Sequence, residues 1–276
     1  MTTSIRYGVV GATGKTGGRV AERLESAGHP VRRLSRGSAP AFDWTEPTGW
    51  AAALAGLDRV YVTYVPDLAV AGSSAAIRTF TEVALEAGIS RIVLLSGRGE
   101  DGARAAEDIV LHSAIDSTIV RASWFSQNFT EGMLADSVAA GFIAIPAGDR
   151  LEPFVDVDDI ADVAVAALTE DGHNGRVFEV TGPELLGFAD AANLLSEATG
   201  HPVAYLPVSF DEFHAAITAE VDAATADLLT ELCREVFDGR NESLTTGVQD
   251  ALGREPRSLR DVIAEAQLAE RSVVAR

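Results

Sequence analysis

A short apolar run that ends in three evenly spaced glycines is the feature that most constrains the fold of this chain. Residues 4–10 are apolar and β-branched enough for a strand buried on both faces, Gly11, Gly14 and Gly17 follow, and residues 16–26 have helical spacing. Glycine permits a tight turn and close approach of a ligand, and the N–H groups of the first helical turn then point at an anion. This order predicts a phosphate-binding strand–turn–helix.

Two other interpretations of this stretch are weaker. One is a plain connecting turn in a chain with 25 glycines. The other is a Walker loop, suggested by Gly14-Lys15-Thr16, but that loop needs four residues between its first glycine and the Gly-Lys pair, and only two separate Gly11 from Gly14. We therefore predict a dinucleotide-binding loop whose cofactor-binding residues are Gly11, Thr13, Gly14, Lys15, Thr16 and Gly17.

Length and composition limit the classes of protein to which this chain can belong. The chain has 276 residues and a mass of 29.0 kDa, which suits one large α/β domain or two interleaved lobes. No apolar run approaches the roughly 20 residues of a membrane span, no secretory signal precedes the first strand, and the single cysteine, Cys233, fits a reducing cytoplasm. A net charge of −19 disfavours nucleic acid as a partner. We expect a cytoplasmic monomer or homodimer whose partner is a small-molecule substrate, with no membrane partner.

Strands and helices alternate along the first half of the chain. After the glycine loop we predict strands at 31–35, 41–44, 59–65, 91–96 and 117–121, and helices at 50–57, 73–87 and 103–113. This alternation predicts an α/β fold with a Rossmann-type doubly wound parallel sheet. Later segments are less regular, with strands at 141–145, 176–181 and 203–206 and helices at 157–168, 188–199, 211–217 and 223–237. We assign residues 1–155 to the NAD(P)-binding Rossmann domain and 156–276 to a smaller, mostly helical substrate lobe interleaved with it.

The residue after the second predicted strand indicates which nucleotide binds. An acidic residue about 20 positions beyond the loop would bind a ribose 2′-hydroxyl, but Ser35 and Arg36 stand there. A guanidinium suits a 2′-phosphate, so NADP(H) is favoured over NAD(H), which stays an alternative, as does a merely solvated strand edge. Asp43 and Trp44 are expected beside the adenine ring.

Ligands of doubly wound sheets bind beyond the carboxyl ends of the strands. The glycine loop, Arg36, Tyr64, Ser96 and residues 122–128 are therefore expected around one crevice. Tyr64 is the tyrosine expected to reach it, either as a catalytic group or as an aromatic that packs on the cofactor. Asp156, Asp158 and Asp159 are explained by helix capping, and we expect no metal site. Glu107 and Asp108 are expected on a solvated helix face.

Four segments together resemble a known family: GATGKTGG at 11–18, Ser96-Gly97, TIVRASWFSQNF at 118–129 and VDVDDIADVAVAAL at 155–168. With them the chain resembles the NmrA-like branch of the atypical short-chain dehydrogenase/reductases, including quinone-reductase-like members, over nearly its whole length. The resemblance implies NADP(H) binding and reduction of a quinone-like, conjugated carbonyl or biosynthetic-intermediate substrate. It also implies the alternative of a regulatory protein that senses NADP(H) without turnover.

The same resemblance implies roles for individual residues. Ser96 would hydrogen-bond the nicotinamide ribose or the substrate carbonyl, Trp124 and Phe125 would wall the substrate pocket, and Asn128 would orient the substrate; core packing is the alternative for the two aromatics. The catalytic candidates are thus Tyr64, Ser96 and Asn128.

The proton relay of ordinary short-chain dehydrogenases is missing from the sequence. Those enzymes use a Tyr-x-x-x-Lys pair on the helix after the fifth predicted strand, where the lysine lowers the tyrosine pKa. Lys15 is the only lysine of this chain, and its four tyrosines all lie outside 103–113. We therefore predict an NADPH-dependent oxidoreductase that works without this relay.

Overall fold

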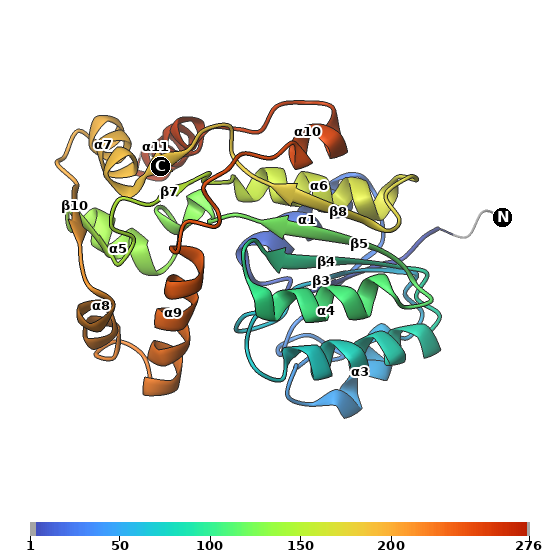
Figure 1. The fold of residues 1–276 in the computed structure, drawn as a ribbon. Helices are drawn as coiled ribbons and strands as arrows, with labels where there is room; N and C mark the ends of the chain where they lie inside the picture. The colour runs from blue at the N-terminus through green and yellow to red at the C-terminus, as the bar shows by residue number, and fades with distance from the viewer. Residues whose placement is uncertain (1–3, 275–276) are drawn as a thin grey trace. The chain divides into compact units, whose positions relative to one another are not determined.

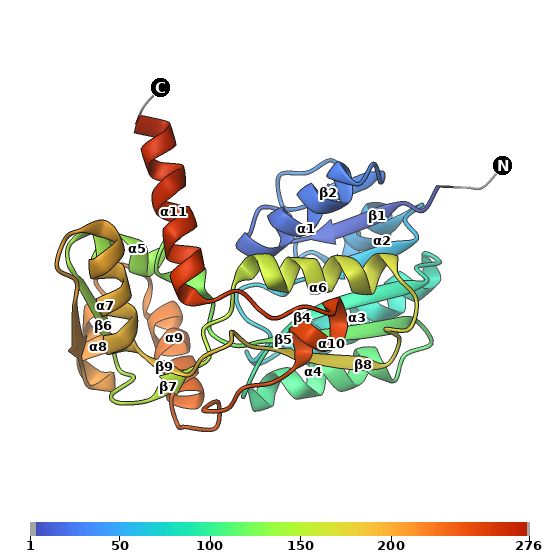
Figure 2. The ribbon, with the colours of Figure 1, turned by 90° about the horizontal axis from the view of Figure 1, so that it is seen from above.

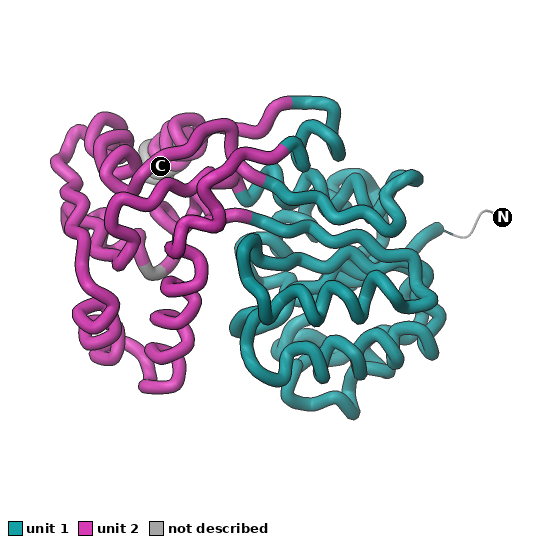
Figure 3. Tube along the Cα trace, in the orientation of Figure 1, with its two compact units in different colours: residues 1–122, 157–180, 246–254 teal, residues 123–156, 181–245, 255–276 magenta. Residues whose placement is uncertain are grey.

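The structure, a computed structural model, describes the backbone of residues 4–274 and their side chains except Met133 and 268–274. The chain divides into two compact units (Figure 3). Unit 1 comprises residues 1–122, 157–180 and 246–254, and unit 2 comprises residues 123–156, 181–245 and 255–276.

Unit 1 is built on a parallel sheet that has six strands in the described residues, in the order β2-β1-β3-β4-β5-β8. The strands are β1 (Tyr7–Val10), β2 (Val31–Leu34), β3 (Arg59–Val62), β4 (Arg91–Gly97), β5 (Asp116–Ala122) and β8 (Arg176–Val180). Strand β1 lies between the edge strand β2 and β3, with Tyr7 in register with Val31 on one side and Arg59 on the other. The strand order therefore reverses between β1 and β3, and the predicted doubly wound fold is confirmed.

Helices cover both faces of this sheet (Figures 1 and 2). One face carries α1 (Lys15–Ser26) and α6 (Val157–Thr169), which pack against each other, and α10 (Gly247–Leu252) packs on α6 and β8. The other face carries α2 (Trp50–Leu54), α3 (Ser73–Glu86) and α4 (Asp101–Leu111), with the short 3₁₀ helix η1 (Pro47–Gly49) before α2. The core under these helices includes the fully buried side chains of Trp50, Ile77 and Phe80. The inner strands are therefore buried on both faces, which fits their continuous apolar character, whereas the edge strands β2 and β8 are partly exposed.

Unit 2 is mostly helical, as predicted. Its helices are α5 (Met133–Ala139), α7 (Phe188–Thr199), α8 (Phe210–Ile217), α9 (Ala223–Val236), α11 (Leu259–Val274) and the 3₁₀ helix η2 (Ser126–Asn128). Two small sheets accompany them, in which β6 (Phe142–Ile145) pairs with β10 (Ala204–Pro207) and β7 (Leu151–Glu152) pairs with β9 (Leu186–Gly187). The core of this unit is rich in aromatic rings centred on Phe188, which contacts five others.

The predicted strand at 41–44 is absent from the described secondary structure. Local hydrogen bonds hold the segment instead, because the Phe42 N–H donates to the Ser35 carbonyl at 2.9 Å and the Trp44 indole side chain donates to the Thr63 carbonyl at 3.0 Å. The segment folds back over the end of β2, so it adds no strand to the sheet.

The predicted domain boundary after residue 155 is also corrected. Residues 157–180 belong to unit 1, because β8 pairs with β5 from Thr118–Arg176 to Ala122–Val180 and α6 packs on α1. Residues 123–156 belong to unit 2. The chain interleaves the two units more finely than a single boundary allows.

Candidate functional site

The glycine loop has the geometry of a phosphate cradle. Gly11 has φ +77°, and a Cβ there would lie 2.0 Å from the Thr63 hydroxyl oxygen. A Cβ on Gly17 would lie 2.3 Å from the Gly11 carbonyl oxygen. Gly14 differs, since it is exposed and its Cβ would meet only that carbonyl, at 3.3 Å. The fold itself thus requires glycine at 11 and 17, while position 14 leaves the backbone open to a ligand.

The first turn of α1 has features that favour the binding of an anion. Gly14 is the N-cap in extended conformation, none of the side chains that the structure describes caps the helix, and the first turn has no acidic residue. The N–H groups that begin a helix lack intrahelical partners and carry the positive end of its dipole. Thr13 is exposed at this turn, and Thr16 and Gly17 are buried beneath it. The predicted contact of these residues with a pyrophosphate stays a prediction.

Three arginines lie at β2, and Arg36 differs from the other two. Arg32 donates to the carbonyls of Ala53 and Ala55 at 2.8 and 2.9 Å, and Arg33 forms a bidentate pair with Glu25 at 2.9 and 2.7 Å. Arg36 is exposed and its guanidinium makes no hydrogen bond or ion pair with any described residue. Arg36 is therefore the arginine that is available to an anion at this end of the sheet.

Trp44 and Tyr64 lie together at the carboxyl end of β3. Their ring centroids are 4.8 Å apart, and both rings pack on the core under α2 and α3. Thr63, which the sequence analysis does not single out, ties them to the loop, because its carbonyl accepts from Trp44 and its hydroxyl donates to the Val10 carbonyl at 3.2 Å. Burial raises the pKa of Tyr64, so its hydroxyl stays protonated at neutral pH.

Asp43 has a local role in the turn that precedes α2. Its carboxylate accepts hydrogen bonds from the Thr45 N–H at 2.9 Å and the Thr45 hydroxyl at 2.8 Å. These bonds, with the charge of Arg36, lower the pKa of Asp43. Asp43 and Arg36 thus share one surface beyond the end of β2, and the expected contact of Asp43 with adenine stays a prediction.

Ser96 lies on β4 with its hydroxyl turned inward. It is buried and donates to Glu107 on α4 at 2.6 Å. Its proton is therefore committed to a carboxylate, and the expected donation to a substrate carbonyl is not available in this arrangement. The hydroxyl oxygen can still accept a hydrogen bond, so the expected contact with the nicotinamide ribose stays a prediction.

Glu107 is a correction to the predicted solvated helix face. Its side chain is buried because α4 packs this face on β4 and β5, and it forms a bidentate pair with Arg121. Arg121 also pairs with Glu179, whose carboxylate lies 3.4 Å from Arg98. The hydrogen bonds to Glu107 raise the pKa of Arg121 further. Asp108, by contrast, is exposed as predicted.

The sheet-facing side of α4 has no tyrosine or lysine. Its buried residues are Ala103, Ala106, Glu107 and Val110. The one buried carboxylate on this side, that of Glu107, is already paired with Arg121 and Ser96.

The predicted substrate-binding residues lie in unit 2 on the segment that follows β5. Trp124 is half-buried, with its ring centroid 5.7 Å from Phe188 and 5.2 Å from Phe237, so the core-packing alternative holds for part of its surface. Phe125 is half-buried and forms a parallel bridge with Val155. Asn128 is half-buried and ends η2. The crevice that would join these residues to the glycine loop stays a prediction.

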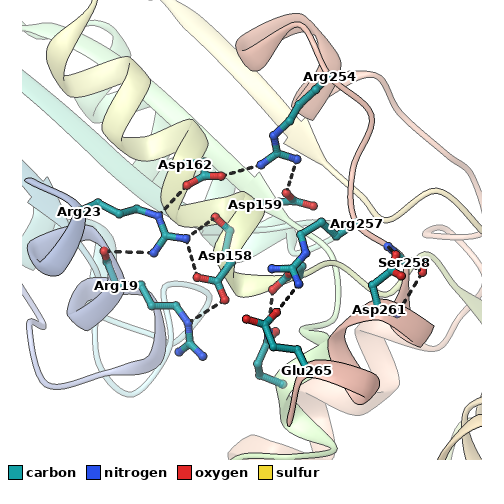
Figure 4. Close-up of polar contacts among 12 residues, drawn as sticks. Arg19, Arg23, Asp158, Asp159, Asp162, Arg254, Arg257, Ser258, Asp261 and Glu265 are labelled. Carbon is teal, nitrogen blue, oxygen red and sulfur yellow. Dashed lines mark hydrogen bonds and ion pairs between the residues drawn. The ribbon is translucent and has the colours of Figure 1, made fainter. Parts of the chain in front are cut away.

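The acidic entry of α6 is occupied by arginines (Figure 4). Asp158 lies 3.3 Å from Arg19 and 2.5 Å from Arg23 on α1, and Asp159 lies 2.7 Å from Arg254. In unit 2, Asp156 lies 3.1 Å from Arg257. Among the described residues no group of three or more His, Cys, Asp or Glu could hold a metal ion. Ion pairing thus accounts for these aspartates, and no sequence pattern points to their distant partners.

In the described part of the chain, no helix is both long and apolar enough to cross a membrane.

A parallel sheet with a glycine turn after its first strand, and with its strand order reversing at that strand, defines a Rossmann-type dinucleotide-binding protein. Residues 11–171 match the model of the NAD(P)H-binding family, and the chain belongs to that family.

Known proteins of similar sequence and structure agree with this assignment. The NAD(P)H azoreductase of Xenophilus azovorans is 33% identical over 249 residues, covering 81% of this chain and 85% of the relative. The (4-alkanoyl-5-oxo-2,5-dihydrofuran-3-yl)methyl phosphate reductase of Streptomyces griseus is 31% identical over 285 residues, covering 93% and 96%. The triphenylmethane reductase of Citrobacter sp., solved with NADP(H), has a TM-score of 0.81 at 22% identity, covering 95% of this chain and 100% of that one.

These findings confirm the predicted class. The chain is an NAD(P)H-dependent oxidoreductase with a Rossmann fold, consistent with the NmrA-like, atypical short-chain type.

Proposed function

We propose that this protein is an NADPH-dependent reductase of a small conjugated carbonyl compound, such as a quinone-like molecule or an unsaturated biosynthetic intermediate. The observation that carries the proposal is the sheet-facing side of α4, which bears paired Glu107 and no tyrosine or lysine. A simple ketone needs a positioned acid when its oxygen becomes an alkoxide. A conjugated acceptor takes hydride at carbon and spreads the charge onto its oxygen, which water can protonate.

The residues of unit 1 support NADPH as the preferred nucleotide. The glycine loop and the first turn of α1 fit the pyrophosphate, and Arg36 offers an uncommitted guanidinium beyond β2. Such a group bonds a 2′-phosphate with charge assistance that a 2′-hydroxyl cannot match.

When bound, the reduced nicotinamide supplies the hydride, with two electrons, and leaves as the oxidised form. Side chains of the protein would position the cofactor and the substrate. Ser96 would accept a hydrogen bond from the cofactor, Tyr64 would pack beside it as a neutral phenol, and Trp124 and Phe125 would wall the substrate while Asn128 orients it. The proton that completes the reduction would come from solvent.

The relatives support a conjugated substrate without defining it. The name of the Streptomyces griseus relative describes an unsaturated lactone with an acyl group, and the name of the Xenophilus azovorans relative describes an azo compound. Both types of substrate accept hydride into a conjugated system. We infer the same electronic property for the substrate of this chain.

A substrate panel tests this proposal. NADPH oxidation should be measured with quinones, enones, imines and aldehydes, and with saturated ketones as the matched unconjugated set. We expect turnover with conjugated members and little with saturated ketones. Tight NADPH binding with no turnover of any member would instead support the NADP(H)-sensing alternative, which the missing relay on α4 also favours.

A further inference from the structure

Three buried polar side-chain atoms without a hydrogen-bond partner belong to one stretch of four residues in unit 2. Among the described side chains, Ser123 Oγ, Trp124 Nε1 and Ser126 Oγ are buried polar atoms with no partner. Such groups are rare in native proteins, because a buried donor without a partner costs free energy, and each needs an explanation. Their concentration in one segment argues for a shared explanation.

The other tryptophans of the chain show what an indole N–H normally does in this protein. Trp44 Nε1 donates to the Thr63 carbonyl at 3.0 Å, and Trp50 Nε1 donates to the Asp43 carbonyl at 2.7 Å. The chain has three tryptophans, and only Trp124 has an N–H without a partner among the described residues.

The buried serines give the same contrast. Ser73 donates to the Leu68 carbonyl at 2.6 Å, Ser96 to Glu107 at 2.6 Å, and Ser117 to the Val110 carbonyl at 3.2 Å. Ser123 and Ser126, which flank Trp124, have no such partner among the described residues.

The backbone places Trp124 and Ser126 on one side of the segment. Phe125 is extended, with φ −71° and ψ 127°, and the Trp124 carbonyl and Ser126 N–H both bond to Val155, at 2.9 and 2.8 Å. Side chains on either side of an extended residue leave opposite to its own, so those of Trp124 and Ser126 leave on the side of the segment opposite Phe125. The two unpartnered donors therefore lie on one side of the segment.

We propose that the Trp124 indole N–H and the Ser126 hydroxyl are the hydrogen-bond donors that hold the carbonyl oxygens of the substrate. The inference rests on the proposed function. It adds that the protein recognises its substrate by carbonyl oxygens that accept hydrogen bonds from these two donors. Both donors would strengthen as charge develops on a carbonyl oxygen, which supplies stabilisation that the missing tyrosine would otherwise provide.

Binding to the NADP⁺-saturated protein tests the inference apart from turnover, because the oxidised cofactor cannot reduce the probe. The dissociation constant of a naphthoquinone should be measured by calorimetry for the unaltered protein, Trp124→Phe and Ser126→Ala. Loss of one donor should weaken binding about three- to tenfold in each variant, while NADP⁺ binding is unchanged.

Thermal stability is the second readout, with Trp50→Phe and Ser117→Ala as matched controls whose donors are paired. The controls should lower the melting temperature and leave quinone binding unchanged. Ser126→Ala should leave the melting temperature unchanged or raise it, since it removes an unpaired group.

Trp124→Phe and Ser126→Ala variants that bind the quinone like the unaltered protein would overturn the inference, as would an unaltered protein that binds no naphthoquinone. Quinone binding that depends on both donors, without NADPH turnover, would instead overturn the proposed reduction and leave the inference standing.

Discussion

Gly17 shows how tightly the glycine loop is built. A Cβ at this position would lie 2.3 Å from the Gly11 carbonyl oxygen and 2.8 Å from its carbon, both backbone atoms. A larger residue therefore has to displace the loop itself. The neighbouring Gly18 has room, because its Cβ would meet the Ala12 carbonyl at an ordinary 3.6 Å.

Substituting these two glycines separates loop geometry from general helix effects. We expect Gly17→Ala to weaken NADPH binding at least about tenfold, because the moved loop no longer aims its N–H groups at the pyrophosphate. Gly18→Ala should bind NADPH nearly as tightly as the unaltered protein. Fluorescence titration with NADPH checks both. Equal affinities for the two variants would mean that the loop does not hold the phosphates.

Arg36 gives a prediction about nucleotide choice. Arg36→Glu should weaken NADPH binding by a factor of about 10–100 and NADH binding far less, since it removes a charge-assisted bond and adds repulsion toward a 2′-phosphate. Arg33→Glu makes the same charge change at an arginine already paired with Glu25, and it should shift the preference much less. Titrations with both nucleotides check this. An equal loss for NADPH and NADH in Arg36→Glu would show that Arg36 does not recognise the phosphate.

At the residue scale, the sequence predicts what depends on local spacing. The loop and the position of Arg36 follow from glycine spacing and strand ends. Ser96 and Glu107 show where this fails, because they meet only when α4 packs on β4. The helical spacing of Ala103, Ala106 and Val110 places Glu107 on the buried face, but its charge predicts a solvated one. Long-range pairing of charged groups has no local signature.

At the element scale, α6 is held at both ends by arginines from other elements. Its acidic entry pairs with Arg19 and Arg23 of α1. At its other end Arg91 donates to the carbonyls of Ala167 and Leu168, each at 3.3 Å, and Arg59 donates to the Leu168 carbonyl. Cations at a helix C-terminus satisfy its last carbonyls and complement its dipole. These contacts explain why α6 belongs to unit 1.

Asp158 makes the stability of this element depend on pH. Burial raises the pKa of Asp158, but the hydrogen bonds and charges of Arg23 and Arg19 outweigh it, so the pKa lies below its usual 3.8. A depressed carboxyl pKa contributes stability above the unfolded-state value, and that stability is lost as pH falls through the folded-state value. Asp158→Asn should cost about 1–2 kcal/mol at neutral pH.

The cost of Asp158→Asn should shrink as pH falls below about 4, because the native carboxylate then protonates as well. Urea unfolding of both proteins from about pH 7 to about pH 3 checks this dependence. Asp171→Asn is the control, since that side chain is 97% exposed beside Arg91 and should matter little at any pH. A constant difference between Asp158→Asn and the unaltered protein would contradict the ion pair.

For the whole molecule, alternation of strands and helices predicts unit 1 well and unit 2 only in part. Sequence patterns find α7, α8 and α9 but not the two-residue strands β7 and β9, which are too short to show a period. They also miss the return of residues 246–254 to unit 1. That return depends on a tertiary contact, since a Cβ on Gly247 would lie 2.0 Å from the Glu179 carbonyl oxygen of β8.

Cys233 provides a probe of the opening of unit 2. The thiol is 6% exposed on α9, and burial raises its pKa to about 12 from 9.0, so its thiolate fraction at neutral pH falls about a thousandfold. A chromogenic thiol reagent should react very slowly with the native protein and rapidly in denaturant. Because the chain has one cysteine, the signal reports α9 alone. Rapid stoichiometric labelling under native conditions would contradict the packing of α9.

The central claim is that this chain reduces a conjugated carbonyl compound with NADPH and without the usual relay. The most direct measurement follows NADPH and a naphthoquinone together in the presence of the purified protein. We predict that NADPH disappears as an equal amount of hydroquinone forms, with a rate that saturates in both reactants. Saturable NADPH binding in which neither the naphthoquinone nor any enone, imine or aldehyde accelerates NADPH oxidation would contradict the claim.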